Sequence, residues 1–312
     1  MLSARKGSIR LFAFSGIDVF LHWSWFLVAA FEIQNRKGRY SSLTWNVVEY
    51  LALFLIVLLH EFGHALACRQ VGGTAGQIVL WPLGGVAYVN PPSRPGATLW
   101  SIAAGPLVNL ALLPLLYVAV MLSRSLGWAQ TMPDLFHLLR TVFYLDLVLL
   151  VFNMLPIYPL DGGQILRSLL WFVIGRARSL LVATILGLGG VAGFIGLAFW
   201  MHSVWYAAIA VFMLTNCWSG LKRAQALLRF AKLPRRDGFV CPLCKTPPPI
   251  GDYWTCGECH QPFDTFRARA ICPRCARQFA LTKCLDCGAA RPISEWVGPA
   301  ISVSSTFPAS TI

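Results

Sequence analysis

Long apolar stretches separated by short polar segments fill most of the first 221 residues. Six of them reach or approach the ~20 apolar residues that a helix needs to cross a bilayer. We expect transmembrane helices at residues 11–33, 47–67, 97–122, 135–157, 180–200 and 204–221. Basic residues before the first stretch would also suit a signal peptide, but no small-residue cleavage site follows, so we interpret this stretch as a helix too.

Polar side chains are unevenly distributed among these six stretches. The last two contain no Asp, Glu, Lys or Arg, whereas each of the first four contains polar or ionisable residues. Because such groups are costly in hydrocarbon, they mark the helices that build a site. We interpret His22 in the first stretch and Asp146 in the fourth as internal polar contacts outside that site.

Composition agrees with a membrane-embedded body. The 312 residues are 56% hydrophobic and 12% charged, with a mean hydropathy of +0.61, which excludes a single water-soluble globular domain. Lys and Arg gather at both ends and in the loops expected on the same side, which places both termini in the cytoplasm. The basic run at residues 222–236 is interpreted as a topological and lipid-headgroup anchor.

A metal-binding pattern lies in the second stretch, where residues 59–64 read Leu-His-Glu-Phe-Gly-His. His60 and His64 share one helix face and can hold one Zn²⁺, while Glu61 can take a proton from metal-bound water. His64 lies five residues before Arg69, so at ~1.5 Å per residue the site is ~8 Å from the cytoplasmic end of its helix.

A third ligand is available in residues 153–163, which read Asn-Met-Leu-Pro-Ile-Tyr-Pro-Leu-Asp-Gly-Gly. Pro156 and Pro159 stop a hydrophobic helix at depth, and the two glycines permit a tight re-entry. Asp161 then lies in irregular backbone that can turn toward a metal, because such backbone at membrane depth must line a cavity. As an alternative, Asp161 could only cap the next helix.

The HExxH helix, followed nearly a hundred residues later by N-x-x-P-x-x-P-L-D-G-G, resembles the site-2 protease family of intramembrane zinc metalloproteases. The resemblance implies that His60, His64 and Asp161 bind the catalytic zinc and leave a fourth position for water or substrate. It implies that Glu61 is the general base.

Two asparagines and a glycine match the family pattern less specifically. Gly105 and Asn109 fit a GxxxN segment in the third stretch, which the family places near the substrate or the oxyanion, and Asn153 is a second candidate there. Close helix packing would equally select Gly105 and Asn109. Asn153 would equally cover backbone groups freed by Pro156.

Residues 81–89 resemble the re-entrant β-hairpin that follows the HExxH helix in this family. Gly84 and Gly85 are therefore expected to contact the substrate. A helix must be extended before a protease can cut it, and an added strand supplies hydrogen bonds for the unwound backbone.

Four CxxC pairs contain eight of the ten cysteines: Cys241 and Cys244, Cys256 and Cys259, Cys272 and Cys275, Cys284 and Cys287. In a reducing cytoplasm these thiols bind metal instead of forming disulfides, and eight ligands make two structural Cys₄ zinc sites. We expect sequential pairing of the CxxC pairs, the first with the second and the third with the fourth, with a cross-braced arrangement as the alternative. Because the segment has little core, zinc would supply on the order of 10 kcal/mol of its folding free energy.

The expected fold is an α-helical polytopic membrane protein with about six transmembrane helices, a re-entrant β-hairpin and a small C-terminal zinc-ribbon module. The zinc ribbons stand where the compact bacterial branch of the family usually carries a CBS domain. The expected organisation is a metalloprotease domain at 1–221, a basic juxtamembrane linker at 222–237, tandem zinc ribbons at 238–291 and a disordered tail at 292–312.

By resemblance, we expect an intramembrane zinc metalloendopeptidase of the bacterial inner membrane that cuts helical membrane proteins near the cytoplasmic face during regulated intramembrane proteolysis. Its expected partners are the lipid bilayer, a membrane-protein substrate and a cytosolic regulatory protein bound by the zinc ribbons; nucleic acid is not expected. The alternatives are a silent scaffold that displays zinc ribbons and a metal transporter. The complete His-Glu-His-Asp set argues against the scaffold, and polar groups that converge at one level argue against the transporter.

Overall fold

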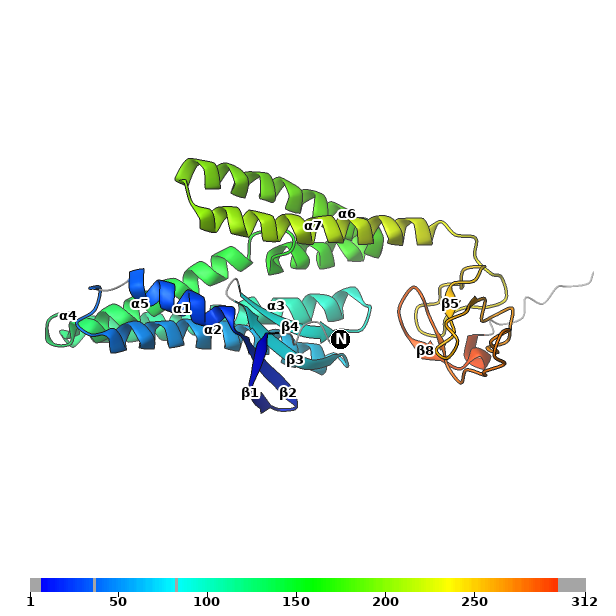
Figure 1. The fold of residues 1–312 in the computed structure, drawn as a ribbon, viewed down its shortest axis with the longest axis horizontal. Helices are drawn as coiled ribbons and strands as arrows, with labels where there is room; N and C mark the ends of the chain where they lie inside the picture. Colours follow the sequence, from blue (N-terminus) through cyan, green and yellow to red (C-terminus); the bar gives the residue numbers. More distant parts are fainter. Residues whose placement is uncertain (1–6, 36–37, 82–83, 297–312) are drawn as a thin grey trace, which may run out of the picture. The chain divides into compact units, whose positions relative to one another are not determined.

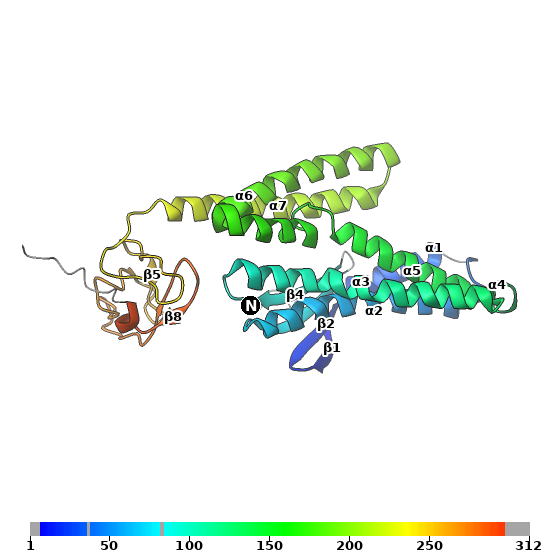
Figure 2. The same cartoon turned by 180° about the vertical axis from the view of Figure 1, so that it is seen from behind.

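The computed structural model describes residues 7–35, 38–81 and 84–296. The chain divides into two compact units, Met1–Leu228 and Arg229–Ile312, and each is described by itself. Figures 1 and 2 show that long helices and a small sheet build the first unit, whereas short strands and loops build the second.

The N-terminal unit begins with a β-hairpin where the sequence predicted a helix. β1 (Ser8–Phe14) and β2 (Ile17–His22) are antiparallel, and both residues of the turn at 15–16 have positive φ, 50° and 71°. Two positive φ angles in a two-residue loop are typical of the type I′ turn, which matches the twist of paired strands. The predicted span at 11–33 is therefore wrong in its first half. Only α1 (Ser24–Asn35) is helical, and its twelve residues extend ~18 Å, less than the ~30 Å hydrocarbon core.

The hairpin continues into a four-stranded sheet. β2 pairs in parallel with β3 (Thr74–Trp81), which pairs antiparallel with β4 (Gly84–Asn90), so the strand order is β1-β2-β3-β4. The β3–β4 pair confirms the predicted re-entrant hairpin, whose residues 82–83 lie outside the described part. In the described residues β4 pairs with β3 alone, so its other edge carries no partner strand.

Four described helices are long and apolar enough to cross a membrane: α2 (Leu43–Gln70), α3 (Pro95–Ser125), α5 (Pro133–Asn153) and α6 (Asp161–Met201). Helices α2, α3 and α6 contain the second, third and fifth predicted spans, whereas α5 ends at Asn153 and leaves residues 154–157 of the fourth outside. These four helices make this an integral membrane protein. The short α4 (Trp128–Thr131) precedes α5, and α7 (Val204–Ala231) contains the sixth predicted span.

Helix α2 is the element around which the site is built. It packs against α3, α5, β3 and β4, and residues of α2, β2 and β3 share the main apolar core. Its contact with α3 is close because Gly63 has no side chain: a Cβ there would lie 2.7 Å from the carbonyl oxygen of Ala104. Helix α6 packs on α3 and is interrupted at Gly175, whose φ of 80° is not helical. This packing brings the start of α6 to α2 and α3.

Cysteines and aromatic side chains form the core of the C-terminal unit. Its short strands are β5 (Trp254–Thr255) with β6 (Pro262–Phe263), and β7 (Thr282–Lys283) with β8 (Ala290–Arg291).

The structure differs from the predicted domain boundaries on both sides of the zinc-ribbon segment. Residues 293–296 of the expected tail form a 3₁₀ helix, and Trp296 is buried in the cysteine and aromatic core. At the other end, residues 222–231 of the expected linker continue α7. Arg235, in the basic run interpreted as a lipid anchor, instead pairs with Asp286 within the same unit at 2.7 Å. The rest of the predicted tail, 297–312, lies outside the described residues.

Candidate active site

Three metal-ligand side chains meet where α2 passes the start of α6. His60 and His64 lie on α2, and Asp161 is the first residue of α6, after the proline-containing loop. The two Nε2 atoms are 3.1 Å apart. Asp161 Oδ2 is 3.0 Å from His60 Nε2 and 3.3 Å from His64 Nε2. The structure therefore brings together the three ligands that the sequence suggested.

The spacing of these three atoms fits a zinc ion. Ligand atoms ~2.0–2.2 Å from a tetrahedral ion lie about 3.3–3.5 Å from one another, close to the separations observed. Both imidazoles are buried, and the aspartate side chain is 14% exposed. Two nitrogens and one carboxylate oxygen are a donor set that zinc accepts, with one tetrahedral position left for a reacting group.

Hydrogen bonds to Nδ1 of each ring fix the orientation and the tautomer of the two histidines. His64 Nδ1 lies 2.9 Å from the carbonyl oxygen of Ser101 on α3. A carbonyl oxygen only accepts, so His64 Nδ1 carries the proton and Nε2 keeps a lone pair for the metal. His60 Nδ1 lies 2.5 Å from Oδ1 of Asn109, also on α3. A backbone group and an amide thus orient the two rings.

Asn109, predicted near the substrate or the oxyanion, lies behind His60 in the structure. Its side chain is fully buried between His60 and Asp146, and its Nδ2 donates to Asp146 Oδ1 at 2.6 Å. Both ends of the amide are thus engaged inside the protein, and Asn109 contacts the candidate metal ligand His60. Asp146, interpreted from the sequence as a separate polar contact, is part of this network. Only its position as an ionisable residue within an apolar helix could have drawn attention to it.

Glu61 lies against strand β4. Its Oε2 accepts a 2.9 Å hydrogen bond from the backbone N–H of Ala87, and its side chain is buried. The close approach depends on Gly85, because a Cβ there would lie 2.6 Å from Glu61 Oε1 and closer still to the side-chain carbons Cγ and Cδ. The edge strand expected to bind a substrate therefore passes directly beside the candidate base.

The remaining predicted residues lie at different distances from the ligands. A Cβ on Gly105 would lie 2.8 Å from His60 Nε2 and nearer still to the His64 ring, so this glycine leaves room at the ligands. Gly84, at the start of β4, has open space where a side chain would be. Asn153 is partly buried at the C-terminal end of α5 and makes no hydrogen bond to the three ligands.

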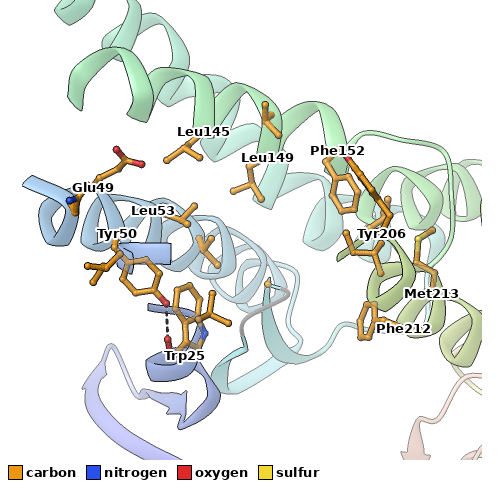
Figure 3. A pocket seen from close by; sticks show the side chains of 18 residues that line it. Trp25, Glu49, Tyr50, Leu53, Leu145, Leu149, Phe152, Tyr206, Phe212 and Met213 are labelled. Carbon is orange, nitrogen blue, oxygen red and sulfur yellow. Dashed lines mark hydrogen bonds between the residues drawn. The ribbon is translucent and has the colours of Figure 1, made fainter. Parts of the chain in front are cut away.

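An apolar groove of about 670 Å³ opens beside the site within the N-terminal unit. Figure 3 shows Leu53 of α2 facing Leu145 and Leu149 of α5, with Phe212 of α7 at one end. Gly84 also lines the groove, which therefore reaches the start of the edge strand. Its apolar lining suits an apolar segment of protein or lipid.

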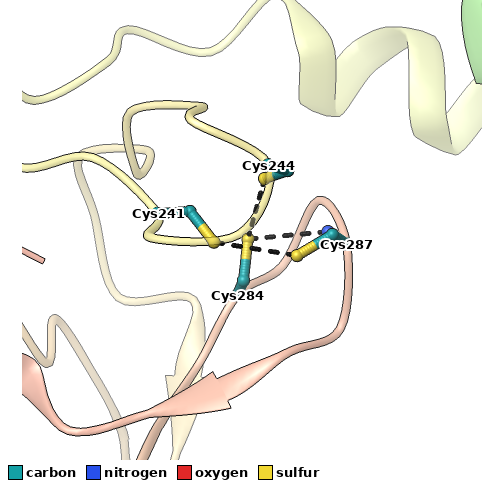
Figure 4. A group of neighbouring side chains, drawn as sticks. All are labelled: Cys241, Cys244, Cys284 and Cys287. Atoms are coloured by element: carbon teal, nitrogen blue, oxygen red, sulfur yellow. Dashed lines mark hydrogen bonds between the residues drawn. The ribbon is translucent and has the colours of Figure 1, made fainter. Parts of the chain in front are cut away.

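The eight cysteines of the four CxxC pairs, called knuckles below, form two groups. The order is nested: the first knuckle joins the fourth, and the second joins the third. The first group is Cys241, Cys244, Cys284 and Cys287, and the second is Cys256, Cys259, Cys272 and Cys275. Figure 4 shows the first and fourth knuckles facing each other. Sequential pairing was therefore wrong, and the cross-braced alternative is excluded too.

Both cysteine groups have the geometry of a zinc site. The Sγ–Sγ distances are 3.7 and 3.8 Å in the first group and 3.6 Å twice in the second. Sulfurs ~2.3 Å from a tetrahedral ion would be about 3.8 Å apart. The backbone N–H groups of Cys275 and Arg274 point at the sulfur of Cys272 and lower its pKa to about 6, which favours the thiolate that binds metal. Both groups can hold structural zinc.

Comparison with known proteins points to one family. The model of peptidase family M50 matches residues 48–134 and 125–197, which include the three ligands and Glu61. The solved site-2 protease from Methanocaldococcus jannaschii is similar with a TM-score of 0.50 and 26% identity, covering 69% of this chain and 95% of that one. The membrane part of the chain is thus similar to peptidase family M50 over residues 48–197, just under half of the chain.

Curated relatives of this chain include two named as zinc metalloproteases. Zinc metalloprotease MJ0392 of Methanocaldococcus jannaschii is 34% identical over 181 residues, 58% of this chain and 50% of the relative. Putative zinc metalloprotease sll0528 of Synechocystis is 28% identical over 256 residues, 75% of this chain and 65% of the relative. The chain thus spans about half to two thirds of the length of these relatives.

Proposed function

We propose that the protein is an intramembrane zinc endopeptidase that hydrolyses peptide bonds in helical membrane proteins. The observation that carries the proposal is the convergence of His60, His64 and Asp161 at zinc-binding distances, with Glu61 beside them on an apolar helix. The names of the curated relatives and the M50 match support the same activity.

Glu61 is the residue that moves the proton in this proposal. A bound zinc would polarise the peptide carbonyl and activate water for attack. The Ala87 N–H holds Glu61 Oε2, which leaves Oε1 to take a proton from the attacking water and pass it to the leaving amine as the C–N bond breaks. We also propose that Asn153, from the end of α5, donates to the developing oxyanion.

Strand β4 is the proposed binding edge for the unwound substrate. It pairs with β3 on one side only, and its Ala87 N–H already points at Glu61. A substrate strand added along this edge would place its backbone beside the catalytic carboxylate. Gly84 and Gly85 would allow this approach because neither carries a side chain there.

The apolar groove is the proposed lateral entrance, and its occupant is a substrate transmembrane helix. Its lining comes from α1, α2, α5 and α7, which are apolar along this face, and includes Gly84, where the substrate would leave its helical form. Asn46 and Glu49 also line it, and the carboxylate of Glu49 accepts a 2.5 Å hydrogen bond from Tyr40. An apolar helix with a polar flank fits this distribution.

We further propose that both termini lie in the cytoplasm of a bacterial cell, with the protein in the inner membrane. The excess of Lys and Arg on the segments expected inside supports this orientation. His64 lies five residues before Arg69, so cleavage would release a fragment to the cytosol. Such release suits regulated intramembrane proteolysis.

The C-terminal zinc module is proposed to recruit a cytosolic regulatory protein. Its two Cys₄ groups form a separate compact unit, which is an arrangement that can present a fixed binding surface. Deleting residues 238–312 tests this idea: changed substrate choice or rate is expected. Unchanged rate and substrate choice would show that the module does not regulate cleavage.

The variant Glu61→Gln tests the activity. It should keep its zinc and lose at least ~10²-fold in cleavage rate, because the amide cannot accept the proton. Membrane proteins that accumulate with this variant, compared with wild type, identify the substrates. A scaffold would show no cleavage even as wild type, and a transporter would move zinc into sealed vesicles; either result would reject the endopeptidase.

A further inference from the structure

Asp146 is a buried carboxylate that the proposed reaction does not use. It lies within the apolar helix α5 and is fully buried. Its Oδ1 accepts from Asn109 Nδ2 at 2.6 Å, while its Oδ2 is buried without a hydrogen-bond partner in the described part of the chain. Holding such a group in this place is costly, and an apolar residue would pack there more cheaply. A carboxylate at this position calls for a role that an apolar residue cannot fill.

The hydrogen bonds from Asp146 to the metal site have only one consistent direction. A carboxylate only accepts, so Asn109 must donate from Nδ2 and turn its Oδ1 toward His60, 2.5 Å from Nδ1. That oxygen also only accepts, so His60 Nδ1 must carry the proton. His60 Nε2 is then left with the lone pair that a metal ion requires.

We propose that Asp146 is a positioning residue for the catalytic zinc, acting through Asn109 on His60. The carboxylate two hydrogen bonds away fixes the tautomer and the ring plane of His60, and its charge stabilises the positive charge that the imidazole gains when it binds a cation. Partners of this kind typically change metal affinity by 10–100-fold. The inference rests on the zinc site of the proposed function but is independent of peptide cleavage.

His64 provides an internal comparison. Its Nδ1 bonds to the backbone carbonyl of Ser101, and this contact does not depend on the Ser101 side chain. The Nδ1 atoms of the two α2 ligands are thus held by different means: His60 by the Asn109 side chain and His64 by a backbone carbonyl. Substitutions at Asn109 and Asp146 should therefore affect the site through His60 alone.

The test measures zinc affinity in the purified full-length protein by competition with a chelator. A His60→Ala, His64→Ala double variant contains only the cysteine-bound zinc and supplies the baseline. Asp146→Leu and Asn109→Leu should each weaken the catalytic site 10–100-fold. Their combination should be no weaker than Asn109→Leu alone, because both act along one path. The isosteric variant Asp146→Asn should lose less than Asp146→Leu, since it keeps an oxygen that can accept.

Ser123→Ala is the matched control: like Asn109, Ser123 is a buried polar residue of α3, but in the described part of the chain its side chain donates to Val120 O of its own helix. It should leave zinc affinity within twofold of wild type. The thermal midpoint and the cysteine-bound zinc report whether each variant is folded. If Asp146→Leu and Asp146→Asn lower the thermal midpoint but leave zinc affinity unchanged, Asp146 contributes only to packing and the proposal is wrong. Additive losses in the combined variant would also overturn the proposal.

Discussion

Nested pairing of the cysteines can be tested by removing the inner pair of knuckles. The change is serine at Cys256, Cys259, Cys272 and Cys275 in the full-length protein. The outer group draws its four ligands only from the first and fourth knuckles, so it should keep its zinc. Three zinc ions per chain in wild type should fall to two, one catalytic and one structural.

Removing the inner site should also weaken zinc binding at the outer site, by an amount that depends on the length of the loop that the outer site closes. It closes a loop of 39 residues, 245–283. When the inner site is formed, it joins Cys256 to Cys275, so only the 21 residues 245–256 and 276–283 with Cys275 remain flexible. Loop-closure entropy then favours the outer site by about 0.5 kcal/mol, a factor of about 2.5 in zinc affinity. Loss of packing in the shared aromatic core would add to this.

Metal analysis of the purified protein and chelator competition provide the measurements. A matched variant with serine at Cys241, Cys244, Cys256 and Cys259 removes the first two knuckles and should retain only the catalytic zinc, since both nested sites lose two ligands. Sequential pairing predicts the reverse: one structural zinc in this second variant and none in the first. That reversal, or the loss of all structural zinc in both variants, would refute the nested arrangement.

Three further predictions concern the membrane site. Gly105→Ala should lose the catalytic zinc, because the new methyl group would lie 2.8 Å from a ligand nitrogen, whereas Gly189→Ala, with open space around it, should keep three zinc ions in the same metal analysis. Gly85→Val should keep zinc yet cleave at least ~10-fold more slowly, since it displaces the catalytic carboxylate; unchanged cleavage would contradict this placement. Leu149→Trp should block the groove and slow cleavage of a membrane-embedded substrate but not of a short soluble peptide, with the exposed Val173→Trp as control.

The local chemistry of both metal centres could be predicted from the sequence. His60 and His64 fall on one face because a helix repeats every 3.6 residues, and a CxxC pair reaches one metal because its turn is short. The loop with Pro156 and Pro159 marked the place where Asp161 could turn toward that face. Each of these patterns depends on a few neighbouring residues, so helix periodicity and the residue preferences of turns are enough to predict it.

Other features could not be predicted from the sequence, because they depend on which distant segments of the chain come into contact. An apolar run gives no periodicity by which a strand can be told from a buried helix, so the hairpin at residues 8–22 was taken for part of a span. The hydrogen bond between Asn109 and Asp146 joins α3 and α5, and the sequence does not show which sides of these helices face each other. Four equivalent CxxC knuckles can pair in three ways with nearly the same loop-closure cost.

The sequence therefore determined the ligand types, the apolar helices and the edge hairpin of this protein. Tertiary structure alone decided the order of the cysteine pairs, the network behind His60 and the extent of the sheet. The physical reason is that local patterns follow from the geometry of one helix or turn, whereas long-range pairings are chosen by the packing of the whole chain.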